Sequence, residues 1–281
     1  MSVNGRTAVY GVVGWPVAHS LSPAMHGAAY AQAGLDAVYT AFPVAPERLD
    51  EALRGAHALG IQGLNVTVPH KQRVATLCVS LDRVAEEVGA VNTLRRTAEG
   101  WEGFNTDAPA CASLLEAAGV SAGTAALLVG AGGAARAAAW ALLRVGAHLR
   151  VAARRPEAAA ELCAQLRSAV GRGRAEPAAW SELGREAERA GVVVNSTSVG
   201  LAGHDERLPA LRFRGGQVAL DFVYGDTDFV RAARAAGARV VTGEQVLVRQ
   251  GALAFTLWTG RAAPEAAMAA AVQAPRPGST R

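Results

Sequence analysis

The segment Ala125–Ala135, AALLVGAGGAA, decides the fold of this chain. Five apolar residues typical of a buried strand run directly into a glycine-rich turn, and a helical pattern continues over Ala134–Val145. A strand, a tight turn and a helix in this order form the context of a dinucleotide-binding fingerprint in a doubly wound α/β sheet. We therefore predict a nucleotide site here, with a plain tight turn as the alternative. The predicted residues are Gly130, Ala131, Gly132, Gly133 and Ala134.

Three small residues of this segment each have a physical role in such a site. Gly130 permits the tight turn, Gly132 lets the backbone approach a pyrophosphate, and Ala135 allows the helix to pack closely on the strand. The N-terminus of the helix adds unpaired N–H donors and a favourable dipole for the phosphate groups.

The next predicted strand, Leu149–Ala153, indicates which dinucleotide binds. An NAD site usually places Asp or Glu at the end of this strand to bind the ribose 2′-hydroxyl, whereas here Arg154 and Arg155 follow it. Guanidinium groups form charge-assisted, often bidentate bonds with phosphate, so the pair predicts the 2′-phosphate of NADP. The alternative is a pair of solvated arginines before a helix that begins at Pro156.

Strand and helix patterns alternate along most of the chain, which predicts an α/β fold with mainly parallel sheets. The predicted strands are Ala8–Val13, Ala37–Phe42, Gly63–Val68, Ala125–Val129, Leu149–Ala153, Val192–Asn195 and Gln217–Asp221. The predicted helices are Pro23–Ala33, Pro46–Leu59, Pro109–Ala118, Ala134–Val145, Pro156–Ser168, Trp180–Ala190 and Gln245–Thr259. We also predict a hairpin of Val91–Arg95 with Gly100–Phe104, a loop at Gly171–Arg174, and a frayed tail over residues 269–281.

Composition narrows the class of protein. With 281 residues and 51% hydrophobic content, the chain is long enough for one or two packed domains. The net charge is +4, but the arginines are scattered without interleaved aromatic residues, so we expect no nucleic-acid partner. The three cysteines lack metal-ligand spacing, so neither a disulfide framework nor a metal site is expected. The sequence also has no signal-peptide pattern and no apolar run of membrane length, so we expect a soluble cytoplasmic protein.

Lys71 is the only lysine among the 28 basic residues. An amine can lose its proton and work as an acid or base, whereas arginine stays protonated. Asn65 and Thr67 share one face at the end of a predicted buried strand, where ligands of parallel sheets gather. Pro69 should stop the strand and place Lys71 in the following turn. The alternative is that coding bias has left one solvated lysine.

Other polar residues lie at similar predicted positions. Ser20 and Ser22, beside a helix N-terminus, form a seat for a carboxylate, although Ser22 also fits an N-cap with Pro23 in the first helical position. Asp107 precedes a helix and is either a site residue or an acid favoured by the helix dipole. Asn92 is either a site residue or a turn residue.

Taken together and in this order, the motifs resemble those of the shikimate dehydrogenase family. The resemblance covers the chain to about Arg261. The motifs are His19–Pro23, Asn65–Lys71, Ala90–Thr93, Gly103–Asp107, Gly130–Ala135, Asn195–Gly200, Asp221–Tyr224 and Gln250–Gly260.

The resemblance implies a fold of two domains with a cleft between them. Residues 1–107, completed by a C-terminal helix at about 245–268, would bind substrate, and residues 108–244 would form a Rossmann-type NADP domain. Ser20 and Ser22 would hold the substrate carboxylate. The other implied substrate residues are Asn65, Thr67, Lys71, Asn92, Asp107, Tyr224 and Gln250. Thr197, Phe222 and Gly243 would join the cofactor site.

The implied activity is the reversible NADPH-dependent reduction of 3-dehydroshikimate to shikimate in chorismate and aromatic amino acid biosynthesis. Lys71 would act as acid and base, paired with Asp107. The alternatives are a quinate or amino-shikimate dehydrogenase of the same superfamily, and a non-catalytic sensor of a shikimate-pathway ligand. The expected assembly is a monomer or a homodimer.

The chain departs from the usual family pattern at four places. Gly27 stands where Asn is usual, and Ala153-Arg154-Arg155 stands where Asn-Arg-Thr is usual. Gly225-Asp226 replaces a proline-containing turn, and Val246 replaces a common methionine. These departures leave cofactor strictness and substrate breadth open.

Overall fold

The computed structural model describes residues 3–171, 173–199, 208–209 and 211–274, and these form two compact units. The first unit comprises Met1–Ala85, Ala90–Thr106 and Leu247–Arg281. The second unit comprises Glu86–Gly89 and Asp107–Val246. Both units are α/β structures, as the sequence predicts.

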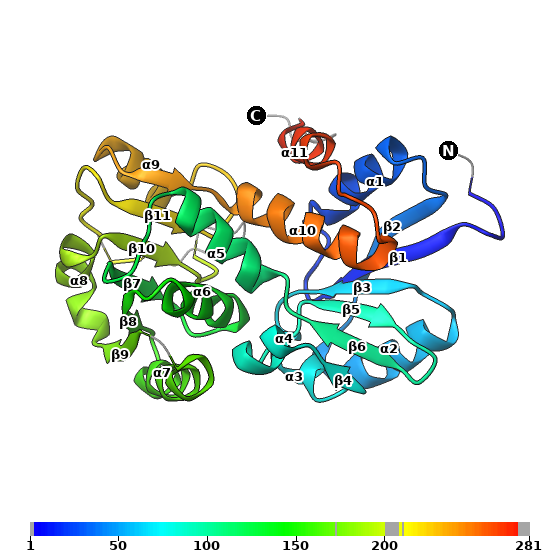
Figure 1. The fold of residues 1–281 in the computed structure, drawn as a ribbon, viewed down its shortest axis with the longest axis horizontal. Helices are drawn as coiled ribbons and strands as arrows, with labels where there is room; N and C mark the ends of the chain where they lie inside the picture. Colours follow the sequence, from blue (N-terminus) through cyan, green and yellow to red (C-terminus); the bar gives the residue numbers. More distant parts are fainter. Residues whose placement is uncertain (1–2, 172, 200–207, 210, 275–281) are drawn as a thin grey trace. The chain divides into compact units, whose positions relative to one another are not determined.

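The first unit contains a six-stranded mixed sheet in the order β2-β1-β3-β5-β6-β4. Strand β1 pairs in parallel with β2 and β3, whereas β5 and β6 form the predicted antiparallel hairpin (Figure 1). The strands are β1 (Ala8–Gly14), β2 (Ala37–Pro43), β3 (Gly63–Val66), β4 (Ser80–Leu81), β5 (Thr93–Arg96) and β6 (Trp101–Phe104).

Helices cover this sheet because their apolar residues recur at helical spacing. Leu49 and Leu53, one turn apart on α2, are buried against Leu64 and Leu94 of the sheet. The helices of the first unit are α1 (Ser22–Gln32), α2 (Leu49–Ala58) preceded by the 3₁₀ turn η1 (Pro46–Arg48), α3 (Lys71–Ala75), the start of α4 (Arg83–Val88), most of α10 (Gly243–Thr259) and α11 (Glu265–Gln273).

The second unit contains a six-stranded parallel sheet in the order β12-β11-β10-β7-β8-β9. This order, with helices on both faces, is the doubly wound arrangement predicted from the glycine-rich turn. The strands are β7 (Ala125–Val129), β8 (His148–Ala152), β9 (Arg174–Ala178), β10 (Val192–Asn195), β11 (Val218–Asp221) and β12 (Arg239–Val241). The helices are α5 (Asp107–Ala117), α6 (Gly133–Arg144), α7 (Pro156–Val170), α8 (Leu183–Arg189) preceded by η2 (Trp180–Glu182), and α9 (Asp228–Ala235).

Alternating residues of the central strand β7 are buried on opposite faces of this sheet. Leu127 and Val129 belong to a core that α8 and α9 complete, while α6 packs against β7 and β8 and lies beside α5. The short segment Glu86–Gly89 groups with this unit because α6 binds it: the Trp140 indole donates to Glu87, and Arg136 donates to the Val88 carbonyl.

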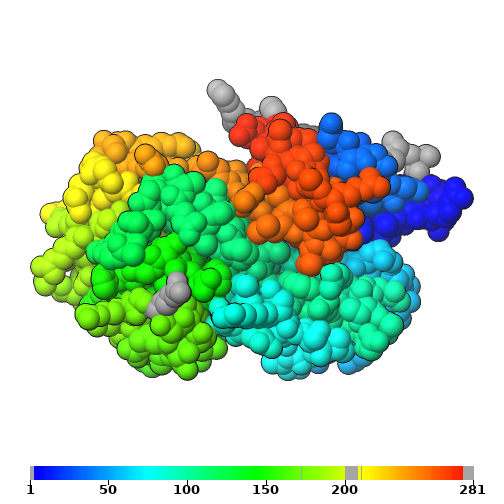
Figure 2. All heavy atoms as spheres, in the orientation of Figure 1, coloured from blue at the N-terminus to red at the C-terminus, as the bar shows by residue number. Residues whose placement is uncertain are grey.

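The structure corrects the predicted tail. Residues 269–273 are the second half of α11, with Met268 and Val272 buried one turn apart, and α11 packs on α1 (Figures 1 and 2). The alanine-rich composition hid this face, because only two large residues mark it. The rest of the predicted tail, residues 275–281, lies outside the described residues.

Other differences concern short elements without a strong apolar pattern. Arg174, predicted in a loop, begins strand β9, where Pro177 is tolerated because β9 is an edge strand. The 3₁₀ turn η1 forms the start of the predicted helix at Pro46. The elements that the sequence did not predict are α3, β4, α4, β9, α9, β12 and α11.

Candidate functional site

The first unit gathers buried amides and hydroxyls at the ends of its central strands. We call Tyr39, Asn65, Asn92, Thr93, Thr106 and Gln250 the amide network. The Tyr39 hydroxyl donates to Asn65 Oδ1 over 2.7 Å, and Asn65 Nδ2 donates to Thr93 Oγ1 over 3.0 Å. All six side chains are buried, and none of them is ionised at neutral pH.

Asn92 is the centre of this network. Its Oδ1 accepts from the Thr106 backbone N–H at 2.7 Å and from Thr93 Oγ1 at 3.1 Å. Its Nδ2 donates to Thr106 Oγ1 at 3.0 Å and lies 3.4 Å from Gln250 Oε1. The network thus unites three predicted substrate residues, Asn65, Asn92 and Gln250. Because Asn92 is a hub inside a buried network, it is not merely a turn residue.

Three members of the network were not predicted as site residues. Thr93 and Thr106 lie within the motifs Ala90–Thr93 and Gly103–Asp107. A polar residue beside an apolar strand could therefore have been predicted as a site residue at both positions. Tyr39 lies within a predicted apolar strand and carried no such signal.

Lys71 is the first residue of the short helix α3 and is half-buried, rather than lying in a turn as predicted. The chain becomes helical at once because the His70 N–H donates to the Thr67 carbonyl and the Val74 N–H donates to the His70 carbonyl. The Lys71 carbonyl accepts from the Val91 N–H at 2.8 Å, which fixes the start of α3 beside Asn92.

The predicted site residues Thr67 and Asp107 belong to different units. Thr67 is half-buried, and its methyl group fills the space where a Cβ on Gly14 would lie, only 2.4 Å away. Asp107 is the first residue of α5 and belongs to the second unit. The pairing of Lys71 with Asp107 therefore stays a prediction.

The serine pair is arranged differently from the prediction. Helix α1 begins at Ser22 itself, so Ser22 is not the N-cap and Pro23 is not the first helical residue. The cause is Leu21, which already has helical φ and ψ of −86° and −9° and makes no side-chain cap bond. Ser20 Oγ instead accepts from the Ser22 N–H at 3.3 Å. Ser20 is half-buried and Ser22 is buried.

The glycine turn of the second unit matches its predicted geometry. Gly130 has φ +116°, and a Cβ there would lie 2.4 Å from Ser196 Oγ, so only glycine fits. Ser196 Oγ donates to the Val129 carbonyl at 2.7 Å and holds this turn against β10. Gly132 caps α6 without a side-chain bond, and among the described residues, apart from its chain neighbours, no atom lies within 4 Å of a Cβ placed on it. The N-terminus of α6, with Ala131, Gly133 and Ala134, is thus open to an anion.

Arg154 and Arg155 follow β8 and are exposed. Arg155 occupies the N-cap position of α7, whose first helical residue is Pro156, and Ala153 is buried. Two guanidinium groups therefore stand where a ribose-binding acid would stand in an NAD site.

Asp221, to which the sequence assigned no role, organises the ends of β10 and β11. Its Oδ1 accepts from Asn195 Nδ2 at 2.9 Å and from the Val223 N–H at 3.0 Å, and its Oδ2 accepts from Thr227 Oγ1 at 2.6 Å. Asn195 Oδ1 in turn accepts from Thr197 Oγ1 at 2.7 Å. Burial raises the pKa of the Asp221 carboxyl from its ordinary 3.8 to about 6, although the three hydrogen bonds oppose the rise.

The loop after Asp221 lies against the start of α10. A Cβ on Gly243 would lie 2.8 Å from the carbonyl oxygens of Phe222 and Val223, so glycine is required where this helix begins. Tyr224 and Phe222 are half-buried, and the Gly225 N–H donates to Glu244 at 2.6 Å. The predicted cofactor residues are therefore linked to Asp221: Thr197 through Asn195, Phe222 as the next residue in the chain, and Gly243 through its contact with the backbone of Phe222 and Val223.

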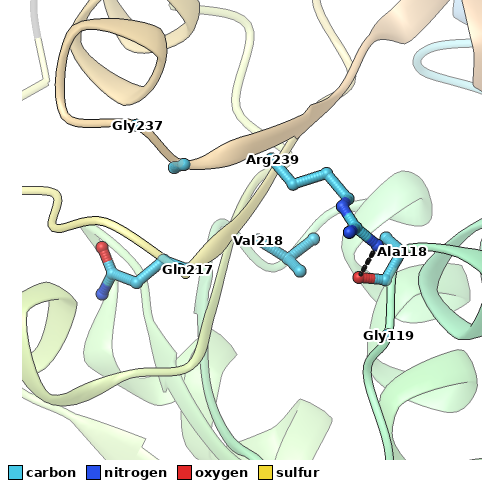
Figure 3. A pocket seen from close by; sticks show the side chains of 8 residues that line it. Ala118, Gly119, Gln217, Val218, Gly237 and Arg239 are labelled. Atoms are coloured by element: carbon cyan, nitrogen blue, oxygen red, sulfur yellow. Dashed lines mark hydrogen bonds between the residues drawn. The ribbon is translucent and has the colours of Figure 1, made fainter.

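A pocket of about 370 Å³ in the second unit lies at the opposite edge of the sheet. Figure 3 shows Val218, the first residue of β11, and Arg239, which donates to the Ala118 carbonyl at 2.8 Å. Because Asp221 ends β11, this pocket is separate from the predicted cofactor residues, and none of them lines it.

The part of the chain that the structure describes offers neither a metal centre nor a membrane span. Its residues contain no cluster of three or more His, Cys, Asp or Glu side chains able to hold a metal ion. None of the helices described there combines the length and apolar character needed to cross a bilayer.

The chain matches two family profiles. The profile of the shikimate dehydrogenase substrate binding domain covers residues 12–94, and that of the shikimate 5′-dehydrogenase C-terminal domain covers residues 243–273. The similar curated proteins include a shikimate dehydrogenase (NADP(+)) of Anaeromyxobacter sp. strain K, 71% identical over 97% of this chain and 98% of that protein. One from Methanopyrus kandleri is 44% identical over 97% of each chain.

Solved structures agree with these similarities and confirm the predicted fold class. Shikimate 5-dehydrogenase of Thermus thermophilus, in complex with NADP(H) and shikimate, is 36% identical with a TM-score of 0.82, covering 95% of this chain and 98% of that chain. Quinate dehydrogenase of Corynebacterium glutamicum in complex with NAD is 30% identical with a TM-score of 0.85, covering 94% and 98%. The resemblance drawn from the motifs is confirmed: the chain belongs to the shikimate dehydrogenase family.

Proposed function

We propose that this protein catalyses the reversible NADPH-dependent reduction of 3-dehydroshikimate to shikimate. It is an NADP-dependent oxidoreductase acting on a CH–OH group, in chorismate and aromatic amino acid biosynthesis. The observation that carries the proposal is the 71% identity to a curated NADP(+) enzyme over 97% of the chain. The buried polar edges of both units support it independently.

The second unit fits NADP. The open space above Gly132 and the uncapped N-terminus of α6 suit a pyrophosphate, and Arg154 and Arg155 suit a 2′-phosphate. NADPH supplies a hydride when bound. Thr197, Phe222 and Gly243 would hold the cofactor beyond the ends of β10 and β11.

The first unit supplies the substrate site. Ser20 and Ser22 hold the carboxylate, and the amides of Asn65, Asn92 and Gln250 offer both donors and acceptors to ring hydroxyls. Thr67 and Tyr224 complete the substrate contacts. Because the amide network is already satisfied internally, it presents its groups in fixed positions before substrate binds.

Lys71 and Asp107 carry the proton chemistry. Reduction of the ring ketone creates negative charge on its oxygen, which the Lys71 ammonium stabilises and then protonates. In the reverse direction the neutral amine removes that proton, a task closed to arginine. The Asp107 carboxylate orients Lys71 and favours its charged form.

The test is the initial rate of NADPH oxidation with 3-dehydroshikimate, followed by absorbance. We expect turnover with this pair and much slower turnover with NADH. Absence of turnover with intact, folded protein would refute the proposal. The same assay run with quinate and NAD distinguishes the alternative that the similarity to quinate dehydrogenase raises.

The proposal also covers the type of partner, the cellular location and the oligomeric state. The partner is a small molecule rather than nucleic acid or membrane, the enzyme works in the cytoplasm, and it is a monomer or a homodimer. Light scattering coupled to size-exclusion chromatography measures the last property, and a tetramer would contradict it.

A further inference from the structure

Asp221 carries a buried charge to which the described residues offer no partner of opposite sign. It is fully buried, and its three hydrogen-bond donors, Asn195, Val223 N–H and Thr227, are all neutral. Among the described residues no lysine, arginine or histidine forms an ion pair with it. The charged group that acts on it is another carboxylate, Glu244 of α10.

A neutral side chain would make nearly the same hydrogen bonds. An asparagine oxygen would accept from Asn195 and Val223, and its amide nitrogen would face the Thr227 hydroxyl, which can accept. The network therefore does not require a charge for its geometry. A buried unpaired charge lowers the stability of the folded protein, so a carboxylate at this position indicates that a bound ligand supplies the opposite charge.

The position of Asp221 indicates which ligand. It ends β11, its bonds fix Thr197 through Asn195, and the next residues, Phe222 and Val223, lie against Gly243. These are the residues assigned to the cofactor site under the proposed function. Oxidised nicotinamide carries a positive charge, whereas reduced nicotinamide is neutral.

We propose that the Asp221 carboxylate makes this site bind NADP⁺ more tightly than NADPH. The inference rests on the proposed function, because it needs the nicotinamide to bind near these residues. Asn195 and Thr227 keep the carboxylate in place. Because Asp221 is buried, solvent screens its charge only weakly. The bias lowers product inhibition by NADPH when shikimate is oxidised and raises inhibition by NADP⁺ when the ketone is reduced.

The test compares dissociation constants of NADP⁺ and NADPH, measured without substrate by calorimetry or protein fluorescence at pH 8. For Asp221→Asn we expect the preference for NADP⁺ over NADPH to fall roughly tenfold, the order of magnitude expected when one weakly screened charge in a protein site is removed. A ratio within twofold of the unmodified protein would overturn the inference.

Two controls separate charge from position. Thr227→Val removes the hydrogen bond to Asp221 and the N-cap bond from the Val230 N–H but keeps the carboxylate, so both affinities should fall together while the ratio stays. Asp228→Asn removes an exposed carboxylate close by in the chain and should change neither affinity. A change of ratio in either control equal to that of Asp221→Asn would overturn the assignment to Asp221.

A pH series on the unmodified protein serves if Asp221→Asn does not fold. Protonation of Asp221 below about pH 6 removes the same charge, so the preference for NADP⁺ should be smaller at pH 5 than at pH 8. The 2′-phosphate also titrates near pH 6, but identically on both cofactors, so the ratio is insensitive to it. Glu244→Gln should retain this pH dependence, and a ratio independent of pH in the unmodified protein would overturn the inference.

These outcomes remain distinct from failure of the proposed function. If neither NADP⁺ nor NADPH binds the unmodified protein, the proposed function is wrong and this inference falls with it. If both bind and the ratio is indifferent to Asp221, only this inference is wrong.

Discussion

Each unit holds a set of polar groups in fixed positions at the ends of buried strands. The central residue of the set is neutral in the first unit and charged in the second. In the first unit Asn92 joins neutral amides and hydroxyls, and each of its polar side-chain atoms donates or accepts within the network. In the second unit Asp221 joins neutral donors through a single buried carboxylate. A neutral network costs little to bury and is indifferent to pH, whereas a buried charge is costly and titrates.

The difference matches what each edge binds under the proposed function. A sugar-like ring with hydroxyls needs both donors and acceptors, and neutral amides provide both. The nicotinamide is positively charged when oxidised and neutral when reduced, so a charged side chain nearby interacts differently with the two states. The comparison leads to four predictions, in order of decreasing effect.

The largest effect is expected at Lys71, the first residue of α3. Lys71→Arg keeps the positive charge but removes the ability to exchange a proton, so we expect kcat to fall by about 10²- to 10⁴-fold with a smaller change in KM. Steady-state kinetics in both directions measure this. Turnover near that of the unmodified enzyme would remove Lys71 from the proton chemistry, and Arg73→Lys, an exposed site two residues away, is the matched control.

The second prediction introduces a charge into the neutral network. Asn92→Asp has the same shape, but a carboxylate cannot donate to Thr106 Oγ1 or face Gln250 Oε1 without repulsion. We expect a loss of about 3 kcal/mol in the free energy of unfolding at pH 7, from one buried unpaired charge and its missing donors. Urea unfolding measures the loss, which should shrink on acidification. An undiminished stability at pH 7 would contradict the view that this edge excludes charge.

The third prediction is the reverse change in the other unit. The pKa of folded Asp221 is about 6 and its ordinary value is 3.8. Its ionisation therefore lowers the stability of the folded protein as pH rises from about 4 to 6, by about 3 kcal/mol at most. Asp221→Asn lacks this loss. We expect the variant and the unmodified protein to be equally stable at pH 4, and the variant to be more stable by up to about 3 kcal/mol at pH 7, because the pKa of about 6 already includes the hydrogen bonds to the carboxylate.

Urea unfolding at pH 4, 5, 6 and 7 gives the difference curve between the two proteins. A constant difference across this range would show that Asp221 has the same protonation in the folded and unfolded states. Asp228→Asn is the control for an exposed carboxylate nearby in the chain, and its difference curve should be flat on this scale.

Sequence patterns anticipated the elements whose signal is local. The strand and glycine turn of Ala125–Gly133, the hairpin of β5 and β6, and the helix α10 all follow from short-range periodicity and turn chemistry. Helix α11 was missed because alanine-rich surroundings conceal which face is buried. Short elements such as β4 and β12 gain their order from neighbouring strands, which no local pattern records.

The candidate site divides along the same line. Asn65, Asn92 and Gln250 were found because motifs mark them, and the structure joins them through long-range hydrogen bonds. Tyr39 and Asp221 were not assigned roles, because one is a tyrosine among apolar strand residues and the other is an acid whose burial depends on three separate segments. Burial and partnership are properties of the assembled sheet, so a sequence pattern cannot reveal them.

The smallest effect is expected at the outer end of the neutral network. Tyr39→Phe removes the hydroxyl that donates to Asn65 Oδ1 and leaves that oxygen without its donor, at a cost of about 1–2 kcal/mol in the free energy of unfolding. Because no charge is involved, this loss should be the same at pH 5 and pH 8, unlike the differences expected for Asn92→Asp and Asp221→Asn. KM for 3-dehydroshikimate should rise a few-fold, since Asn65 loses one of the bonds that orient it. A loss that varies with pH would mean that the amide network contains a titrating group after all, and the contrast between the two edges would then fail.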